Sequence, residues 1–279
     1  MTQDAAADRI PVALTVAGSD SSGGAGIQAD LKTFTVLGVY GTSVLTALTA
    51  QSTRGVSGIL AVPPDFIRNQ IDAVAGDFAI GAVKTGMLNN RETVVAVASA
   101  LKHHALRPLV VDPVIVATSR DTLLSPDAMQ AMRDELIPIA DVLTPNLHEA
   151  ARLLDQPAAK DEPGMITQAR SLLGFGCKAV VIKGGHGEGA EAVDFLVESE
   201  AVTRLALSRI NTRNTHGTGC TFSAAIAASL AQGVPLKQAV LDAKRLVHRS
   251  LQAAAGHSLG KGAGPVDLLH AVRKALQRR

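Results

Sequence analysis

The sequence predicts an α/β fold in which one mostly parallel sheet is covered by helices on both faces. Short aliphatic runs alternate with helical stretches along the chain, the order that builds a doubly wound sheet. Of the residues, 47% are hydrophobic but only 3% are aromatic, so the core consists of Ala, Val, Leu and Ile, as suits buried parallel strands. No internal repeat or long linker divides the chain. We expect a single domain, residues 1–279, whose residues 1–10 have no fixed structure.

Each expected strand is a short aliphatic run that ends beside glycine or a polar residue. The strands are expected at residues 12–18, 42–50, 82–87, 108–114, 142–144 and 179–183. Two less hydrophobic runs, 193–198 and 201–207, predict an antiparallel hairpin, a small flap at the sheet edge. Helices are expected at residues 27–37, 64–74, 91–103, 126–136, 147–154, 165–174, 236–253 and 266–276, and one more begins at the turn ending in Cys220. The loops after the strands should converge on one crevice.

The turn before that last helix is the strongest local signal for a ligand site. Gly217 and Gly219 flank Thr218, and a helix of small apolar residues follows. Backbone N–H groups and the positive end of the helix dipole would then point at one place, which suits an anion. Cys220 falls in the first turn, where we expect the helix to lower its pKa and favour the thiolate. The alternative is a glycine-containing loop before a buried helix, with Cys220 as a small core residue.

Polar residues at other strand ends indicate what chemistry the anion site serves. Asp112, Asn146, Glu149 and Lys183 all follow or end a strand. Carboxylates beside an anion turn suit phosphoryl transfer, because Mg²⁺ binds through one or two carboxylates together with phosphates. This pattern predicts a kinase of a small hydroxyl-bearing molecule. The alternative for Asn146 and Glu149 is a helix capping box.

Several classes of protein are excluded or disfavoured. The formal net charge is only +2 and aromatic residues are scarce, so we expect no nucleic-acid partner. No long apolar run predicts a membrane span. The two cysteines, Cys177 and Cys220, form no disulfide framework, so a cytoplasmic enzyme is expected. The loop at residues 18–26 is neither a dinucleotide fingerprint nor a P-loop, and His148-Glu149 does not continue into a zinc protease motif because Arg152 occupies its last position.

Separated segments in the same order resemble the bacterial hydroxymethylpyrimidine/phosphomethylpyrimidine kinases of thiamine biosynthesis, members of the ribokinase-like superfamily. The likeness runs from about residue 12 to residue 266. The segments that carry it are Ala13–Asp20, Ser22–Thr33, Val111–Val114, Leu143–Ala150, Lys183–His186 and Asn214–Cys220. The resemblance implies a three-layer α/β/α kinase, a homodimer, that uses Mg-ATP. Its implied acceptors are 4-amino-5-hydroxymethyl-2-methylpyrimidine and then the resulting monophosphate.

The resemblance also implies a role for each matched position. The pyrimidine would be lined by Gly18, Ala25, Asp30, Gln51, Met87 and Val114. Polar contacts to the ring edge would come from Asp30 and Gln51. ATP would lie against Asp112, Asn146, Glu149, Lys183 and Gly185, with Mg²⁺ held by Asp112 and Glu149 through water. Gly217, Thr218 and Gly219 would form the anion hole, and Cys220 would be the catalytic base.

Two other functions compete with this interpretation. A pyridoxine/pyridoxal kinase of the same superfamily keeps the Gly-Thr-Gly-Cys turn and phosphorylates a similar alcohol. Gln51 favours the pyrimidine, because its amide can pair with both a ring nitrogen and an exocyclic amine. A sensor that binds a pyrimidine or nucleotide without turnover is the second alternative. Ser21 and Thr85 depart from the residues common in the family and bear on loop rigidity, not on the reaction.

Overall fold

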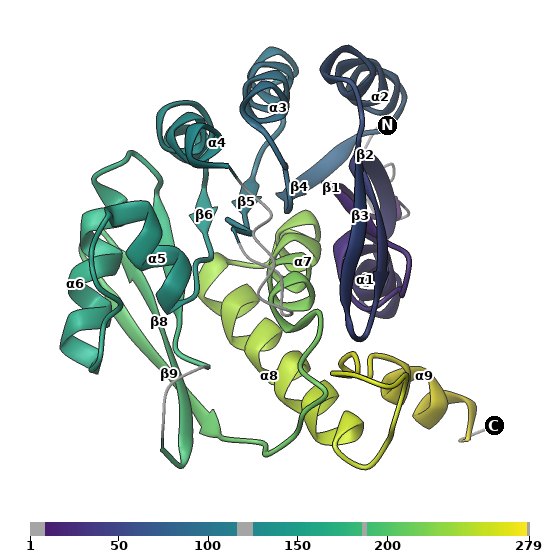
Figure 1. The fold of residues 1–279 in the computed structure, drawn as a ribbon, viewed down its shortest axis with the longest axis vertical. Helices are drawn as coiled ribbons and strands as arrows, with labels where there is room; N and C mark the ends of the chain where they lie inside the picture. Colours follow the sequence, from purple (N-terminus) through teal and green to yellow (C-terminus); the bar gives the residue numbers. More distant parts are fainter. Residues whose placement is uncertain (1–8, 116–124, 186–188, 278–279) are drawn as a thin grey trace, which may run out of the picture.

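A nine-stranded sheet runs through the part of the chain that the computed structural model describes, residues 9–115, 125–185 and 189–277. Its spatial order is β3-β2-β1-β4-β5-β6-β7-β8-β9 (Figure 1). Neighbours from β2 to β7 are parallel, whereas the edge pairs β2–β3, β7–β8 and β8–β9 are antiparallel. The strands are β1 (Val12–Asp20), β2 (Tyr40–Ser52), β3 (Gly55–Ala61), β4 (Ile80–Thr85), β5 (Leu109–Val111), β6 (Val142–Leu143), β7 (Ala179–Lys183), β8 (Glu191–Glu198) and β9 (Val202–Ser208). The mostly parallel sheet and the edge hairpin are confirmed.

Helices cover both faces of the sheet (Figure 1). They are α1 (Gly26–Val36), α2 (Pro64–Asp77), α3 (Arg91–His103), α4 (Pro126–Ala131), α5 (Leu147–Leu154), α6 (Glu162–Leu173), α7 (Thr218–Ala231), α8 (Leu236–Ala254) and α9 (Leu269–Leu276). Side chains that alternate along a strand enter different cores: Leu109 and Val111 pack with α2 to α6, whereas Val110 packs with α1, α7 and α8. None of the helices in the described part of the chain is long and apolar enough to cross a membrane.

The order of the strands creates the crevice. The chain leaves β1 through α1 to reach β2 on one side, and later enters β4 on the other side of β1. Loops that leave neighbouring parallel strands in opposite directions open a gap at their carboxyl ends, where α/β proteins bind ligands. Because β1, β2 and β4 to β7 are parallel, their carboxyl ends share this edge, as expected from the sequence.

Strand β3 was not among the elements expected from the sequence. Its residues include Gly55, Ser57 and Gly58, which weaken a strand signal. In the fold it needs no buried face, because it pairs with β2 at the sheet edge and is mostly exposed. The apolar side chains of Ile59 and Leu60 are 42% and 65% exposed. The β2–β3 hairpin therefore projects apolar surface beside the carboxyl end of β2.

Some helix boundaries also differ from the expectations. The helix expected at residues 126–136 is α-helical only to Ala131 and continues as a π-helical turn, Met132–Leu136, and a 3₁₀ turn, Ile137–Ile139. Pro138 has no N–H to extend a regular helix, and the wider turn keeps Met132 and Leu136 buried. Helix α9 begins at Leu269, not at residue 266. Of the segment expected to lack fixed structure, residues 1–8 lie outside the described residues.

Candidate active site

The predicted anion turn is present at the start of α7. Gly217 is the N-cap and adopts the left-handed conformation, with φ of 77°. The helix begins at Thr218, so the first-turn N–H groups, including those of Gly219 and Cys220, have no acceptor one turn earlier in the helix. The Thr218 hydroxyl donates to the Thr215 carbonyl at 2.6 Å. The Thr218 N–H donates to the same carbonyl at 3.2 Å, so Gly219 and Cys220, and not Thr218 as predicted, offer first-turn N–H groups to an anion.

A second glycine-rich loop packs directly on this turn. A Cβ atom at Gly217 would lie 1.8 Å from the Gly24 carbonyl oxygen, so no other residue fits there without movement. Ala25, a predicted pyrimidine contact, is the N-cap of α1 and donates its N–H to Asp20 at 2.8 Å. The backbone N–H of Gly26 lies near the Cys220 thiol and acts to lower the pKa of the thiol. The two loops thus meet around the sulfur atom.

The expected lowering of the Cys220 pKa is wrong. Burial raises the pKa of this thiol to about 11, and the carboxylates of Asp30 and Asp112 add to the effect. Lys84 and the Gly26 N–H act in the opposite direction but are outweighed. Removing water from around a thiolate costs more free energy than the stabilisation that a helix N-terminus and one backbone N–H provide. Cys220 is nevertheless only partly buried, so it is not enclosed in the core.

Asp112 lies at the end of β5 and is almost completely buried, with 1% exposed. Its carboxylate accepts hydrogen bonds at 3.1 Å from Lys183, Thr144 and Ser223. Burial alone would raise the pKa of Asp112, but Lys183 and Lys84 together lower it. Asp112 is therefore a carboxylate that fixes Lys183 beside the anion turn, where Gly219 lies next to both side chains. The sequence analysis did not predict Thr144 and Ser223 as site residues, because no sequence motif marks a single hydroxyl side chain.

Glu149 and Asn146 form the capping box that was the alternative interpretation. The Asn146 side chain accepts from the N–H groups of His148 and Glu149 at 2.9 Å, and Glu149 accepts from the Asn146 N–H at 2.7 Å. Burial raises the pKa of Glu149 to about 7, opposed by Lys183 and reinforced by Asp112. The capping role and a place in the site coexist, because Asn146 pairs with Lys183 across adjoining strand ends.

Asp30 forms a fully buried ion pair with Lys84, a residue that was not singled out in the sequence. The two side chains are 0% exposed and their charged atoms are 2.8 Å apart, while the Thr15 hydroxyl donates to Asp30 at 2.6 Å. Burial alone would lower the pKa of Lys84, but Asp30 raises it above its usual value, whereas burial raises the pKa of Asp30 against the effect of Lys84 and Thr15. Asp30 thus faces Thr15 and Lys84, and its charge acts on Cys220. Its contact with a ring stays a prediction.

Apolar residues of the predicted pyrimidine pocket lie together. Met87 and Ala47 form a small cluster of their own, with Val114 packed against it. A Cβ atom at Gly18 would lie 3.3 Å from the Met87 sulfur, so Gly18 borders the same group. The Thr46 hydroxyl donates to the Met87 carbonyl at 2.7 Å and fixes the loop after β4. A small apolar cluster of this kind suits contact with one face of a heteroaromatic ring.

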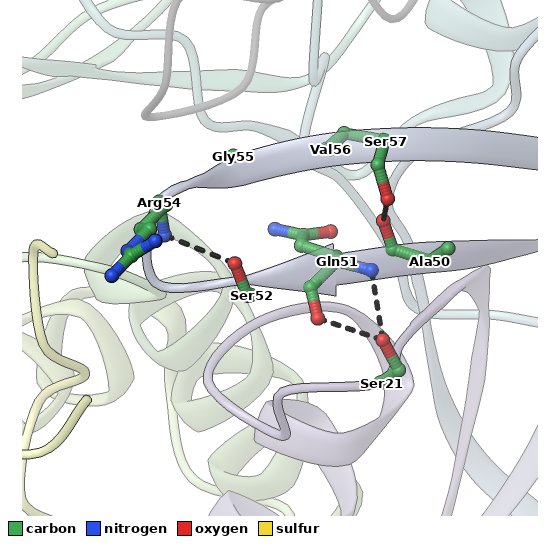
Figure 2. A pocket seen from close by; sticks show the side chains of 8 residues that line it. All are labelled: Ser21, Ala50, Gln51, Ser52, Arg54, Gly55, Val56 and Ser57. Atoms are coloured by element: carbon green, nitrogen blue, oxygen red, sulfur yellow. Dashed lines mark hydrogen bonds between the residues drawn. The ribbon is translucent and has the colours of Figure 1, made fainter. Parts of the chain in front are cut away.

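Gln51 lies on the β2–β3 hairpin and borders a hollow of about 510 Å³ (Figure 2). The lining residues are Ser21, Ala50, Gln51, Ser52, Arg54, Gly55, Val56 and Ser57. Figure 2 shows the Ser21 hydroxyl between the N–H and the carbonyl of Gln51, at 2.8 Å from each. Ser21, a departure from the family, therefore ties the glycine-rich loop to the hairpin. The Gln51 side-chain oxygen accepts from Thr49 at 3.1 Å, which leaves its amide N–H groups for a ligand.

The loop after β7 carries the remaining predicted ATP contact. The Gly185 carbonyl accepts from Arg209 at 2.6 Å, and the Gly184 N–H donates to Asp194 at 2.9 Å. His186, part of the resemblance, lies outside the described residues. In the ranges that are described, no group of three or more His, Cys, Asp or Glu side chains forms a metal site.

The comparison with known proteins places the chain in a family. Residues 20–267 match the family model described as phosphomethylpyrimidine kinase. The chain belongs to this family. It is 52% identical to the hydroxymethylpyrimidine/phosphomethylpyrimidine kinase of Rhizobium meliloti, over 93% of this chain and 97% of the relative. The predicted family and the enzyme class, a kinase, are confirmed.

Solved structures of related kinases have the same fold. A phosphomethylpyrimidine kinase from Clostridium difficile is 40% identical with a TM-score of 0.77, covering 87% of this chain and 100% of its own. An ADP complex of Bacillus subtilis pyridoxal kinase is 38% identical with a TM-score of 0.87, covering 95% of this chain and 99% of its own. The expected α/β architecture is thereby confirmed, and both competing substrates occur among similar proteins.

Proposed function

We propose that this kinase transfers the γ-phosphoryl group of ATP to 4-amino-5-hydroxymethyl-2-methylpyrimidine, and then a second one to the monophosphate, for thiamine biosynthesis. The observation that carries the proposal is 52% identity, over nearly the full length of both chains, to a kinase named for both steps. Incubation with ATP, Mg²⁺ and the pyrimidine alcohol should release ADP. A chain that binds the alcohol without releasing ADP would be a sensor instead.

The site geometry supports a direct transfer. As the alcohol oxygen bonds to the γ-phosphorus, the bond to the β-phosphate oxygen breaks and ADP leaves. The backbone N–H groups of Gly219 and Cys220 face the developing negative charge, and Lys183, held by Asp112, adds a positive charge. Cys220 in its thiolate form accepts the proton of the alcohol. Because its pKa is about 11, the thiolate is the minor form at neutral pH, and the rate should rise as the pH is raised.

Mg²⁺ fits the residues present. Asp112 and Glu149 are separated carboxylates whose oxygens already accept protein hydrogen bonds, so they suit a hydrated ion held mainly by phosphates. Such an ion neutralises phosphate charge when it is bound. Removal of divalent cations with EDTA should abolish ADP release, and added Mg²⁺ should restore it. Full activity in EDTA would exclude this role.

A pyridoxal kinase is the second candidate, favoured by the similarity to the B. subtilis structure. The distinguishing residue is Gln51 on the β2–β3 hairpin, whose free amide N–H groups can donate to a ring nitrogen. Comparison of kcat/KM for the pyrimidine alcohol and for pyridoxine tests the choice. A higher value for the pyrimidine supports the proposal, and a higher value for pyridoxine would overturn it.

We also infer that one domain, residues 1–279, carries both steps and that two copies associate. The hairpin edge supports the homodimer, because Leu48, Ile59 and Leu60 are 45%, 42% and 65% exposed on neighbouring strands. Both cysteines are free thiols, in keeping with the expected cytoplasm. The expectation of no nucleic-acid or membrane partner stays a prediction.

A further inference from the structure

One buried contact joins two loops from opposite ends of the chain. The Nε2 atom of His216 lies 2.7 Å from the Oδ2 atom of Asp20, and these side chains are only 7% and 3% exposed. Asp20 ends β1 and begins the glycine-rich loop, whereas His216 immediately precedes Gly217 of the anion turn. The helices that follow the two loops, α1 and α7, lie side by side (Figure 1). No local sequence motif relates these two residues.

Asp20 organises the whole loop on its side of the contact. Its carboxylate accepts from the N–H and the hydroxyl of Ser22 at 2.8 and 2.7 Å, and from the N–H groups of Gly24 and Ala25 at 3.1 and 2.8 Å. Burial would raise the pKa of Asp20, but the hydrogen bonds from His216 and Ser22 hold it well below its usual range. Asp20 is therefore a carboxylate with almost every lone pair used, and it fixes the path of the chain to Ala25.

His216 is held as firmly from the other side. Its N–H donates to the Gly264 carbonyl and its carbonyl accepts from the Val266 N–H, each at 3.1 Å. Its ring packs on the opposite loop, since a Cβ atom at Gly24 would lie 2.3 Å from the ring carbon Cδ2. Because both its backbone and its ring are fixed, His216 holds the two loops in one relative position.

The two loops carry different parts of the reaction. The first presents Ala25 to the proposed pyrimidine and places the Gly26 N–H near the Cys220 sulfur. The second presents the backbone N–H groups and the thiol itself. A phosphoryl transfer requires the acceptor oxygen and the transferred group to be aligned within a fraction of an ångström. The relative position of these loops therefore sets the transfer distance.

We propose that Asp20 and His216 are positioning residues that lock the acceptor loop onto the anion turn for phosphoryl transfer, an inference that rests on the proposed function. Neither residue touches a substrate in this account. Their effect is on the alignment of the alcohol with the γ-phosphoryl group and the Cys220 thiol. They should therefore control kcat far more than the affinity for ATP, whose predicted contacts Asn146 and Lys183 lie on other segments, at the start of α5 and the end of β7.

The test compares two substitutions of the histidine with a matched control. His216→Leu removes the donor at similar volume, whereas His216→Gln keeps an N–H donor near the Nε2 position. His104→Leu breaks another His–Asp contact, 2.6 Å from Asp72, between α3 and α2 and away from the site. We expect His216→Leu to lower kcat about 100-fold, as loss of alignment does, with little change in KM for ATP. His216→Gln should recover most of the rate, and His104→Leu should match the wild type.

A readout independent of turnover accompanies the kinetics. Alkylation of Cys220 by iodoacetamide, followed by mass spectrometry, should accelerate several-fold in His216→Leu, because separation of the two loops opens the sulfur to the reagent. Cys177 is the internal reference, since burial raises its pKa to about 12. If the leucine variant does not fold, His216→Asn, whose amide is too short to reach Asp20, takes its place. Thermal unfolding of each variant checks the folded fraction.

The outcomes separate the two proposals. A wild-type enzyme without kinase activity refutes the proposed function. An active wild type with an unchanged kcat per folded His216→Leu molecule refutes the positioning role. A stability loss alone, with unchanged kcat and Cys220 alkylation, would show that the contact only supports the fold and would also refute it.

Discussion

Cys220 is the residue at which two physical effects oppose each other. A helix N-terminus stabilises a thiolate, and this effect underlies the expectation from the sequence. In the fold the same sulfur lies near the carboxylates of Asp30 and Asp112 and is largely shielded from water, and these effects are larger. A sequence motif reports the helix start but not the carboxylates that distant strands bring to it.

The pH dependence of Cys220 alkylation follows from its pKa. A thiol with a pKa of about 11 is ionised in about one molecule in a thousand at pH 8, against about one in ten for the ordinary value of 9.0. The rate with iodoacetamide should rise tenfold per unit from about pH 7 to about pH 10 without a plateau. A plateau near neutral pH would show that the thiolate is stabilised after all.

Gln51→Leu tests substrate choice at the scale of one side chain. Loss of the amide leaves ring polar groups unpaired, so kcat/KM for the pyrimidine alcohol should fall about 10- to 100-fold. The value for pyridoxine should change little. Gln130→Leu, on the exposed side of α4, is the control for the same chemical change. Equal losses for both alcohols would remove Gln51 as the source of specificity.

At the scale of elements, the turn before α7 depends on the absence of a side chain. Gly217→Ala places a Cβ 1.8 Å from the Gly24 carbonyl in a left-handed conformation. The two loops must separate, so kcat should fall at least about 100-fold. The free energy of unfolding should fall by about 1–3 kcal/mol. Kinetics and thermal unfolding measure the two effects.

Gly76→Ala is the matched control for the turn. Gly76 lies within α2, and a Cβ there meets nothing within 4 Å. The change should raise the free energy of unfolding by about 0.5–1 kcal/mol with unchanged kcat, because alanine loses less conformational entropy in a helix. A Gly217→Ala variant with wild-type kcat would contradict the role given to the anion turn.

The elements that the sequence predicts best are those whose signals are local. Strand β7 is a continuous buried aliphatic run, and α3 and α5 begin at Asn caps, so their bounds agree with the expectations. Strand β3 has no buried face and no alternating pattern, so only its pairing with β2 defines it. The pairs Asp30–Lys84 and Asp20–His216 could not be predicted, because each joins segments far apart in the chain.

At the scale of the whole molecule, the exposed apolar edge of the β2–β3 hairpin predicts that two copies of the chain associate. Leu60→Glu places a charge on the most exposed of its apolar positions and should convert a dimer into monomers. Size-exclusion chromatography with light scattering gives the mass directly. Leu276→Glu, at a 63% exposed leucine of α9, is the control and should leave the mass unchanged. A monomeric wild type would contradict the proposed homodimer.

The molecule as a whole brings an anion turn, a lysine–carboxylate pair and a thiol to one edge of its sheet. A mass-resolved time course with saturating Mg-ATP and the pyrimidine alcohol, run on the wild type and Cys220→Ala, tests this arrangement most directly. We expect the wild type to form first the monophosphate and then the diphosphate. The variant should bind both substrates but form product about 100- to 1,000-fold more slowly, the range for loss of a general base. Near wild-type turnover by Cys220→Ala would contradict the account.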